Sequence, residues 1–329
     1  MSRRLLAAVA AILCASLVEA AQAQDKITLR YGQIANSARS VSSLPLYIGQ
    51  RKGFFTKEGI DLKVVGLKGV QYQIEELDKG NVDVSYTATP YLLAAVLKGS
   101  DSVGVIGASA NNIYTLIAQP QIKSYDDLKG KVVGLSLPVD TITIATRLLL
   151  EKHGIKEAAF KVKEVVSTRL RGECLAKKEC DAVPMGQPDD IVLAQKGYTK
   201  LGDSFEVIPV LQFSVVAARR AWAQSNKDTV TRLARAFGNA YKFMRDKANR
   251  EEVVKIMGET VNAPADVARS MLELYYEPDR GVMPKQAEIS MPGITKVIEL
   301  LAQTGKLKAP LPAADKFVDL QYLKAAGLH

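Results

Sequence analysis

The 329-residue chain contains few side chains suited to covalent or metal chemistry. Its two histidines, His153 and His329, do not lie beside a candidate nucleophile, so the sequence does not support a Ser/His/Asp or Cys/His catalytic site. No set of Cys and His residues has the spacing of a zinc site, and the glycine-rich phosphate-binding motifs are missing. Adjacent acids such as Asp189 and Asp190 are typical of a solvated helix face. We therefore expect a protein that is not an enzyme and that uses no metal or cofactor.

Polar and aromatic side chains instead gather where predicted strands end. Ligands of open α/β sheets bind outside the carboxyl ends of the strands, where a loop presents unpaired backbone N–H groups. Taken singly, each Ser, Thr or Asn could equally be a helix cap or a turn residue. As a set on matching loops, these residues predict a non-covalent ligand site. The candidates are Asn36, Ser37, Arg39, Tyr86, Thr87, Thr89, Asn111, Ser136, Asp140, Thr141, Gln187 and Phe213, with Asn112, Thr143 and Ser214 beside them.

One stretch shows how such a site is positioned. Asp83 to Gly99 reads DVSYTATPYLLAAVLKG. It predicts a short strand over 82–86, a polar loop over 87–89, and a helix that begins at Pro90 and ends at Gly99. Proline is tolerated in the first turn of a helix because the N–H that it lacks would have no partner there. The loop would leave free N–H groups at a strand end.

This strand-to-helix corner recurs in the second half of the chain. Asp181 to Gly197 reads DAVPMGQPDDIVLAQKG and places Asp, Pro and the closing Gly at the same offsets. Thr89 in the first copy corresponds to Gln187 in the second. We therefore expect two similar α/β units whose corners face each other across a ligand cleft.

Apolar spacing outlines the rest of the chain. Residues 25–34 alternate apolar and polar side chains, as expected of a first strand. From Trp222 onward the spacing is helical. We expect helices over 227–247, 250–259, 266–276, 293–304 and 317–325.

The first 23 residues have the layout of a secretory signal peptide. Arg3 and Arg4 precede an apolar run from Leu5 to Val18, and residues 21–23 form a small-x-small cleavage site. The run is too short to be a membrane span. We expect export to the periplasm.

The net charge of the chain is +9, and processing after residue 23 leaves 42 basic and 34 acidic residues. The basic residues are interleaved with acids, as in KANREEVVK, and lack the aromatic interleaving of single-strand binders. A solvated surface explains them better than a nucleic-acid face, so we expect no nucleic-acid partner.

Cys174 and Cys180 are the two thiols that remain after processing. An even pair this close together in an oxidising compartment predicts a disulfide. The alternative is two independent buried thiols. A disulfide here would fasten a helix end to the strand that leads to Gln187.

Four runs of sequence resemble a known family. They are PLYIGQRKGFFTKEGIDLKVV, ELDKGNVDVSYTATPYLLAAVLKG, SYDDLKGKVVGL and ECDAVPMGQPDDIVL. Together they resemble the periplasmic solute-binding proteins of ABC importers, most closely the type that binds nitrate, sulfonate, taurine or pyrimidine precursors. The resemblance implies an α/β protein with the type two periplasmic binding protein fold, in which two lobes with mixed sheets are hinged around an interlobe cleft.

The resemblance also implies how the chain is divided. Residues 24–116 and 216–329 would form a discontinuous first lobe, and residues 117–215 would form the second. The protein would be a monomer that captures a small organic solute in the cleft and delivers it to a permease in the inner membrane.

Asp140 departs from the pattern that the resemblance implies. Relatives that bind oxyanions commonly have a Gly-Ser pair here, which leaves the N–H groups of the following helix free for the anion. A carboxylate at this N-terminus would cap the helix itself and repel a second anion. We therefore expect a neutral, cationic or mixed-charge solute, such as a small heteroaromatic or a carboxylate held by Arg39 on the other wall.

Two other functions fit the same fold. One is an exported enzyme, such as a dehydratase or a pyrimidine-forming protein, although this would need titratable groups converging in the cleft. The other is a binding module that presents its solute to a sensor. Its cleft would look the same, because fold alone does not fix function.

Overall fold

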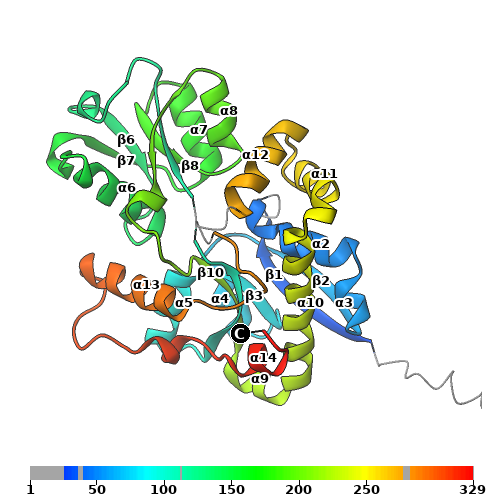
Figure 1. Ribbon diagram of the computed structural model, residues 1–329. Helices are drawn as coiled ribbons and strands as arrows, with labels where there is room; N and C mark the ends of the chain where they lie inside the picture. Colours follow the sequence, from blue (N-terminus) through cyan, green and yellow to red (C-terminus); the bar gives the residue numbers. More distant parts are fainter. Residues whose placement is uncertain (1–25, 36–39, 112, 277–281, 329) are drawn as a thin grey trace, which may run out of the picture.

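The computed structural model describes residues 26–35, 40–111, 113–276 and 282–328. In this part of the chain the strands form two five-stranded mixed sheets, each covered by helices (Figure 1). The sheets belong to two α/β lobes, which confirms the predicted fold class.

In the first sheet four strands run in the same direction, and a fifth, which returns from the other lobe, runs antiparallel to them. Strand β1 pairs in parallel with β2 and β3, whereas β10 runs antiparallel between β3 and β4. In spatial order the strands are β2 (Ile60–Leu67), β1 (Ile27–Ile34), β3 (Val84–Ala88), β10 (Ser214–Arg219) and β4 (Ser102–Ser109).

The second sheet repeats this arrangement. Strand β6 pairs in parallel with β7 and β8, and β5, the first strand after the chain leaves the first sheet, runs antiparallel between β8 and β9. In spatial order the strands are β7 (Lys161–Glu164), β6 (Val132–Leu135), β8 (Ala182–Met185), β5 (Thr115–Ala118) and β9 (Thr199–Asp203).

Each sheet therefore receives one antiparallel strand just after the chain crosses from the other sheet. The crossings are the segments 110–114 and 204–213, between β4 and β5 and between β9 and β10. Two crossings that lie side by side are the covalent arrangement expected of a hinge.

The helices divide unequally between the lobes. Three of them pack on the second sheet: α6 (Thr141–Lys152), α7 (Thr168–Ala176) and α8 (Asp189–Gln195). The first sheet is surrounded by α2 (Leu44–Arg51), α3 (Phe54–Lys57), α4 (Tyr72–Asp78), α5 (Thr89–Leu97), α9 (Arg220–Ser225), α10 (Lys227–Arg245), α11 (Arg250–Val261), α12 (Ala265–Tyr276), α13 (Met291–Gln303) and α14 (Gln321–Ala325).

The larger hydrophobic core lies between the first sheet and these helices. Every residue of β4 is buried, as expected of a strand covered on both faces. A Cβ at Gly107 of β4 would lie 1.9 Å from the carbonyl oxygen of Glu288, so the close approach of that segment requires glycine. Among the described residues, no helix combines the length and hydrophobicity needed to cross a bilayer.

Two sequence-based element boundaries are wrong. The segment 87–89 is not a loop, because β3 continues through Ala88 and α5 begins at Thr89. The continuation buries Thr87 in the ladder with β10. The last predicted helix, over 317–325, starts only at Gln321, because Val318 is extended and forms a bridge with Gly104.

Candidate functional site between the lobes

The two crossings are tied to each other where they pass between the sheets. Asn111 is 3% exposed, and its Nδ2 donates to the carbonyls of Ile208 at 3.0 Å and Pro209 at 2.9 Å. The backbone N–H of Phe213 donates to the carbonyl of Ala110 at 3.0 Å. Since both amide hydrogens of Asn111 are engaged by the second crossing, this predicted ligand residue holds the two connections together.

The corner of the first lobe is built by β3, α5 and the return of β10. The N–H of Thr89 donates to the carbonyl of Phe213 at 2.9 Å, which joins two predicted site residues. Among the described residues, the buried hydroxyl of Thr89 has no hydrogen-bond partner. A buried hydroxyl without a partner costs free energy unless another group satisfies it.

Tyr86 and Thr87 point to opposite faces of the first sheet, because consecutive residues of a strand alternate. They therefore do not line one wall together. Burial raises the pKa of Tyr86, while the neighbouring hydroxyls of Ser214, Ser42 and Ser109 lower it in part. The phenol remains a neutral hydrogen-bonding group at the strand ends.

In the second lobe, Ser136 and Asp140 lie together at the end of β6. Asp140 is the N-cap residue of α6, but its side chain makes no capping hydrogen bond, so the prediction that it caps its own helix is wrong. Its carboxylate instead accepts hydrogen bonds from the hydroxyls of Ser136 and, at 2.6 Å, of Tyr91. Thr141, the first residue of α6, is buried beside it.

The second copy of the corner, at Gln187, is engaged on both sides of its amide. Gln187 Nε2 donates to Asp190 Oδ2 at 2.7 Å, and Gln187 Oε1 accepts from the hydroxyl of Tyr275 at 2.8 Å. Thr115 of β5 donates to the same Asp190 oxygen. Burial raises the pKa of Asp190 against these donors.

An aromatic and cationic group lies between the two corners. The Arg171 guanidinium carbon lies 6.0 Å from the centre of the Tyr114 ring, and that ring lies 6.5 Å from the Phe213 ring. Burial raises the pKa of Tyr114 to about 12, with Arg171 opposing the shift and Tyr86 and Asp140 adding to it. Tyr114, on the first crossing, is thus within electrostatic reach of predicted residues from both lobes.

The structure brings the predicted residues together in two sets, one for each lobe, and the links between the sets were not predicted. Tyr91 and Tyr275 join the lobes, and Arg171 lies beside Tyr114. Tyr91 had a weak indication of a site role in the sequence, since it is an aromatic residue in the first turn of the helix after the corner. Tyr275 had none, because it is 88 residues away from its partner. Four candidates lie outside the described residues: Asn36, Ser37, Arg39 and Asn112.

Two cavities of about 340 and 360 Å³ are present elsewhere on the molecule. The first is bounded by the second crossing and α13, at Pro209 and Lys296 among others. The second lies between α4 and α5 and includes Tyr91. Neither includes Thr89 or Gln187, so the proposed cleft between these two corners stays a prediction.

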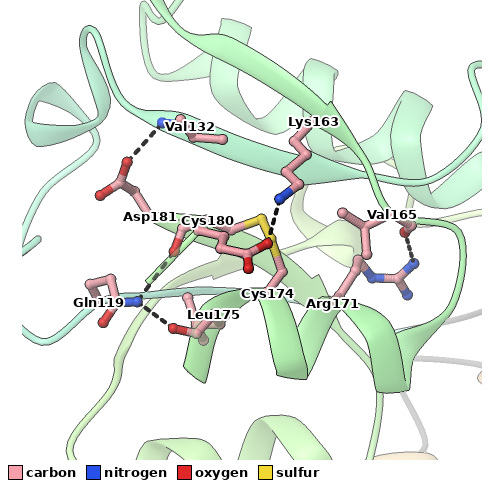
Figure 2. The surroundings of a disulfide bond; sticks show 10 residues. Gln119, Val132, Lys163, Val165, Arg171, Cys174, Leu175, Cys180 and Asp181 are labelled. Carbon is pink, nitrogen blue, oxygen red and sulfur yellow. Dashed lines mark hydrogen bonds and ion pairs between the residues drawn. A yellow bond between two sulfur atoms is a disulfide. The ribbon is translucent and has the colours of Figure 1, made fainter. Parts of the chain in front are cut away.

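The predicted disulfide is present, and it lies just before β8, the strand that leads to the second corner. Cys174, near the end of α7, is bonded to Cys180, just before β8 (Figure 2). The Nε2 of Gln119 donates to the carbonyl of Leu175 at 2.6 Å and to that of Cys180 at 3.2 Å. The bond therefore fastens the helix to the strand that leads to Gln187.

No cluster of three His, Cys, Asp or Glu side chains suited to a metal ion occurs in the residues that the structure describes. The polar groups described above are hydroxyls, amides, the carboxylates of Asp140 and Asp190, and the guanidinium of Arg171. These groups can hold a ligand by hydrogen bonds and charge.

Two mixed-sheet lobes joined by two crossings define the fold class of the periplasmic binding proteins. The family model described as NMT1/THI5 like matches residues 40–250, and the chain belongs to this family. The chain is 20% identical over 280 residues to YtlA of Bacillus subtilis (strain 168), a candidate binding protein, with 82% of this chain and 84% of YtlA covered.

Solved structures share the fold at low sequence identity. One is the ligand-binding component of an ABC-type import system from Staphylococcus aureus with zinc bound, at a TM-score of 0.75 and 17% identity, covering 91% of this chain and 98% of the other. Another is the alkanesulfonate-binding protein SsuA from Xanthomonas axonopodis pv. citri bound to MOPS, at a TM-score of 0.68 and 19% identity, covering 89% and 99%.

One relative is an enzyme by name. The chain is 21% identical over 170 residues to the 4-amino-5-hydroxymethyl-2-methylpyrimidine phosphate synthase THI11 of Saccharomyces cerevisiae (strain ATCC 204508 / S288c). The match covers 48% of this chain and spans about half of THI11, at 49%. It is partial, whereas the match to YtlA runs along most of both chains.

Proposed function

We propose that this protein is an extracytoplasmic solute-binding protein that captures a small organic molecule between its lobes and delivers it to the permease of an ABC importer. The observation that carries the proposal is the pair of strand-to-helix corners, one in each lobe, that carry Thr89 and Gln187. The family and the shared fold of ABC import components support it. The protein would be exported to the periplasm as a monomer, after loss of residues 1–23.

The division of the chain belongs to the same proposal. Residues 24–116 and 216–329 would move as one lobe and residues 117–215 as the other, bending at the crossings. At the boundaries, residues 115–116 would move with the second sheet and residues 214–215 with the first, because they pair there. In support, the two crossings are joined to each other by Asn111, so they can bend as a unit.

The charge of the solute follows from Asp140 and Arg171. Both donors to the Asp140 carboxylate are neutral hydroxyls, so its negative charge is not cancelled by an ion pair with them. Arg171 is buried, and its donors are occupied by the carbonyls of Pro184, Val165 and Val166 and by a hydroxyl. This environment suits a neutral, cationic or mixed-charge solute better than a simple oxyanion.

Native mass spectrometry of the protein isolated from the periplasm tests the proposal. We expect a fraction of the chains to carry one small molecule that is released on denaturation and that binds back to the dialysed protein at a ratio of one to one. A protein that carries no adduct, and that binds none of the amines, amino acids, heteroaromatics and sulfonates offered to it, would contradict the proposal. The same spectra report whether Cys174 and Cys180 are joined, by a difference of about two mass units.

A further inference from the structure

Two tyrosines of the first lobe reach across to the second. Tyr91 is on α5 and donates to Asp140 at the start of α6. Tyr275 is on α12, which extends toward the lobe that carries α7 and α8 (Figure 1), and it donates to Gln187. Both acceptors are predicted ligand residues. The first lobe therefore contacts the second through the groups that would recognise the solute.

The contact at Tyr91 fixes one carboxylate between two hydroxyls. Asp140 Oδ1 accepts from Tyr91 and Oδ2 from Ser136, so the second lobe supplies one restraint and the first lobe supplies the other. Burial and the neighbouring carboxylate both raise the pKa of Tyr91. The phenol therefore keeps its proton, and it can donate to Asp140 throughout the physiological range of pH.

The contact at Tyr275 continues into the second sheet. Its hydroxyl orients Gln187, which donates to Asp190, and Asp190 in turn accepts from Thr115 of β5. Burial raises the pKa of Tyr275 well above its usual value, so this phenol is also a permanent donor. A side-chain amide can rotate, and with Nε2 bonded to Asp190 the tyrosine fixes Oε1 as the acceptor.

We propose that Tyr91 and Tyr275 are positioning residues that complete the site only when the lobes close. This inference rests on the proposed function. It means that residues of the first lobe orient Asp140 and Gln187 of the second lobe. On opening, both hydrogen bonds break, and the carboxylate and the amide lose one restraint each. The two bonds then stabilise the closed form and set the geometry that the solute meets.

Distances between two spin labels, one in each lobe, measure the ratio of open to closed protein directly. Labels at Lys242→Cys on α10 and Glu151→Cys on α6 would be placed on exposed positions, one in each lobe, with Cys174 and Cys180 kept oxidised. Because a neutral hydrogen bond makes a modest net contribution, Tyr91→Phe or Tyr275→Phe should each raise the ratio of open to closed protein about fivefold, and the double variant more. The matched control, Tyr47→Phe on α2 of the first lobe, should leave the distance distribution unchanged.

Two substitutions of the acceptor separate positioning from a general structural role. Asp140→Asn keeps an oxygen that accepts from Tyr91, so the closed population should remain, whereas Asp140→Leu should open the protein as Tyr91→Phe does. Adding Tyr91→Phe to Asp140→Leu should cause no further opening. Melting temperatures within a few degrees of the parent would show that each variant is folded.

The inference is overturned if the distance distributions of both phenylalanine variants and of Asp140→Leu match that of the parent. Its failure differs from failure of the proposed function. A protein that binds a solute but shows no change in distance contradicts the role of the tyrosines. A protein whose variants open as expected but that binds no solute contradicts the proposed function.

Discussion

Arg171 is a charged side chain that is almost fully buried in the second lobe. It is 1% exposed and donates to the carbonyls of Pro184, Val165 and Val166 and to the hydroxyl of Thr168. Burial lowers its pKa, opposed by Tyr114 and Asp140. The guanidinium is stable there because it satisfies carbonyls that the ends of the strands leave open.

Replacing Arg171 with leucine should lower the free energy of unfolding by about 3 kcal/mol, because the buried carbonyls of Pro184 and Val165 and the partly buried carbonyl of Val166 lose their donor. Urea titration followed by circular dichroism measures this change. The control is Arg169→Leu, two residues away on the same helix, whose side chain is 76% exposed and pairs with Glu173. It should change the stability by less than about 0.5 kcal/mol. Equal effects from the two substitutions would argue against this role of Arg171.

Asp140→Ser should change which solutes bind. Serine removes a negative charge from the N-terminus of α6, whose N–H groups the Asp140 side chain does not cap. We expect affinity for small sulfonates to rise about tenfold or more and affinity for cationic solutes to fall similarly. Isothermal titration calorimetry with matched sulfonate and amine probes measures both, and unchanged preference would mean that Asp140 does not face the solute.

At the level of elements, the repeated corner was readable from the sequence because it depends on local chemistry. Proline and glycine at fixed offsets predicted α5 and α8, and both Gly99 and Gly197 have the positive φ of a helix end. The helices α10, α11, α12 and α13 also follow the predicted spacing within one or two residues. The sequence did not predict which strands pair with each other in the sheets. The return of β10 beside β3 extends that strand through Ala88, and this depends on a segment more than 120 residues away.

The disulfide is an element-level restraint whose contribution can be measured. It closes a loop with a sequence separation of 6 residues. By restricting the unfolded chain it should stabilise the folded state by about 2 kcal/mol, a modest value because closing a short loop removes little entropy from the unfolded chain. The double variant Cys174→Ala and Cys180→Ala should unfold at a correspondingly lower urea concentration. A reducing agent should lower the parent's midpoint and leave the variant's unchanged. If the reductant lowers both midpoints equally, the stabilisation does not come from this bond.

For the whole molecule, the two α/β lobes were predictable from periodicity and family resemblance. The links across the lobes were not. Asn111 was expected to face a ligand, but it bonds the second crossing, and Tyr275 acts at a distance of 88 residues from Gln187. Contacts of this kind depend on how two folded lobes meet, which no local pattern encodes.

The central claim is that a small solute lies between Thr89 and Gln187 and is held from both lobes. A crystal structure of the protein with the solute identified by mass spectrometry tests it most directly. We predict density for one molecule between the two corners, within hydrogen-bonding distance of Asp140 and of at least one hydroxyl of the first lobe, with Tyr91 and Tyr275 bonded as described here. A solute bound outside this region, for example in the cavity between α4 and α5, would contradict the account.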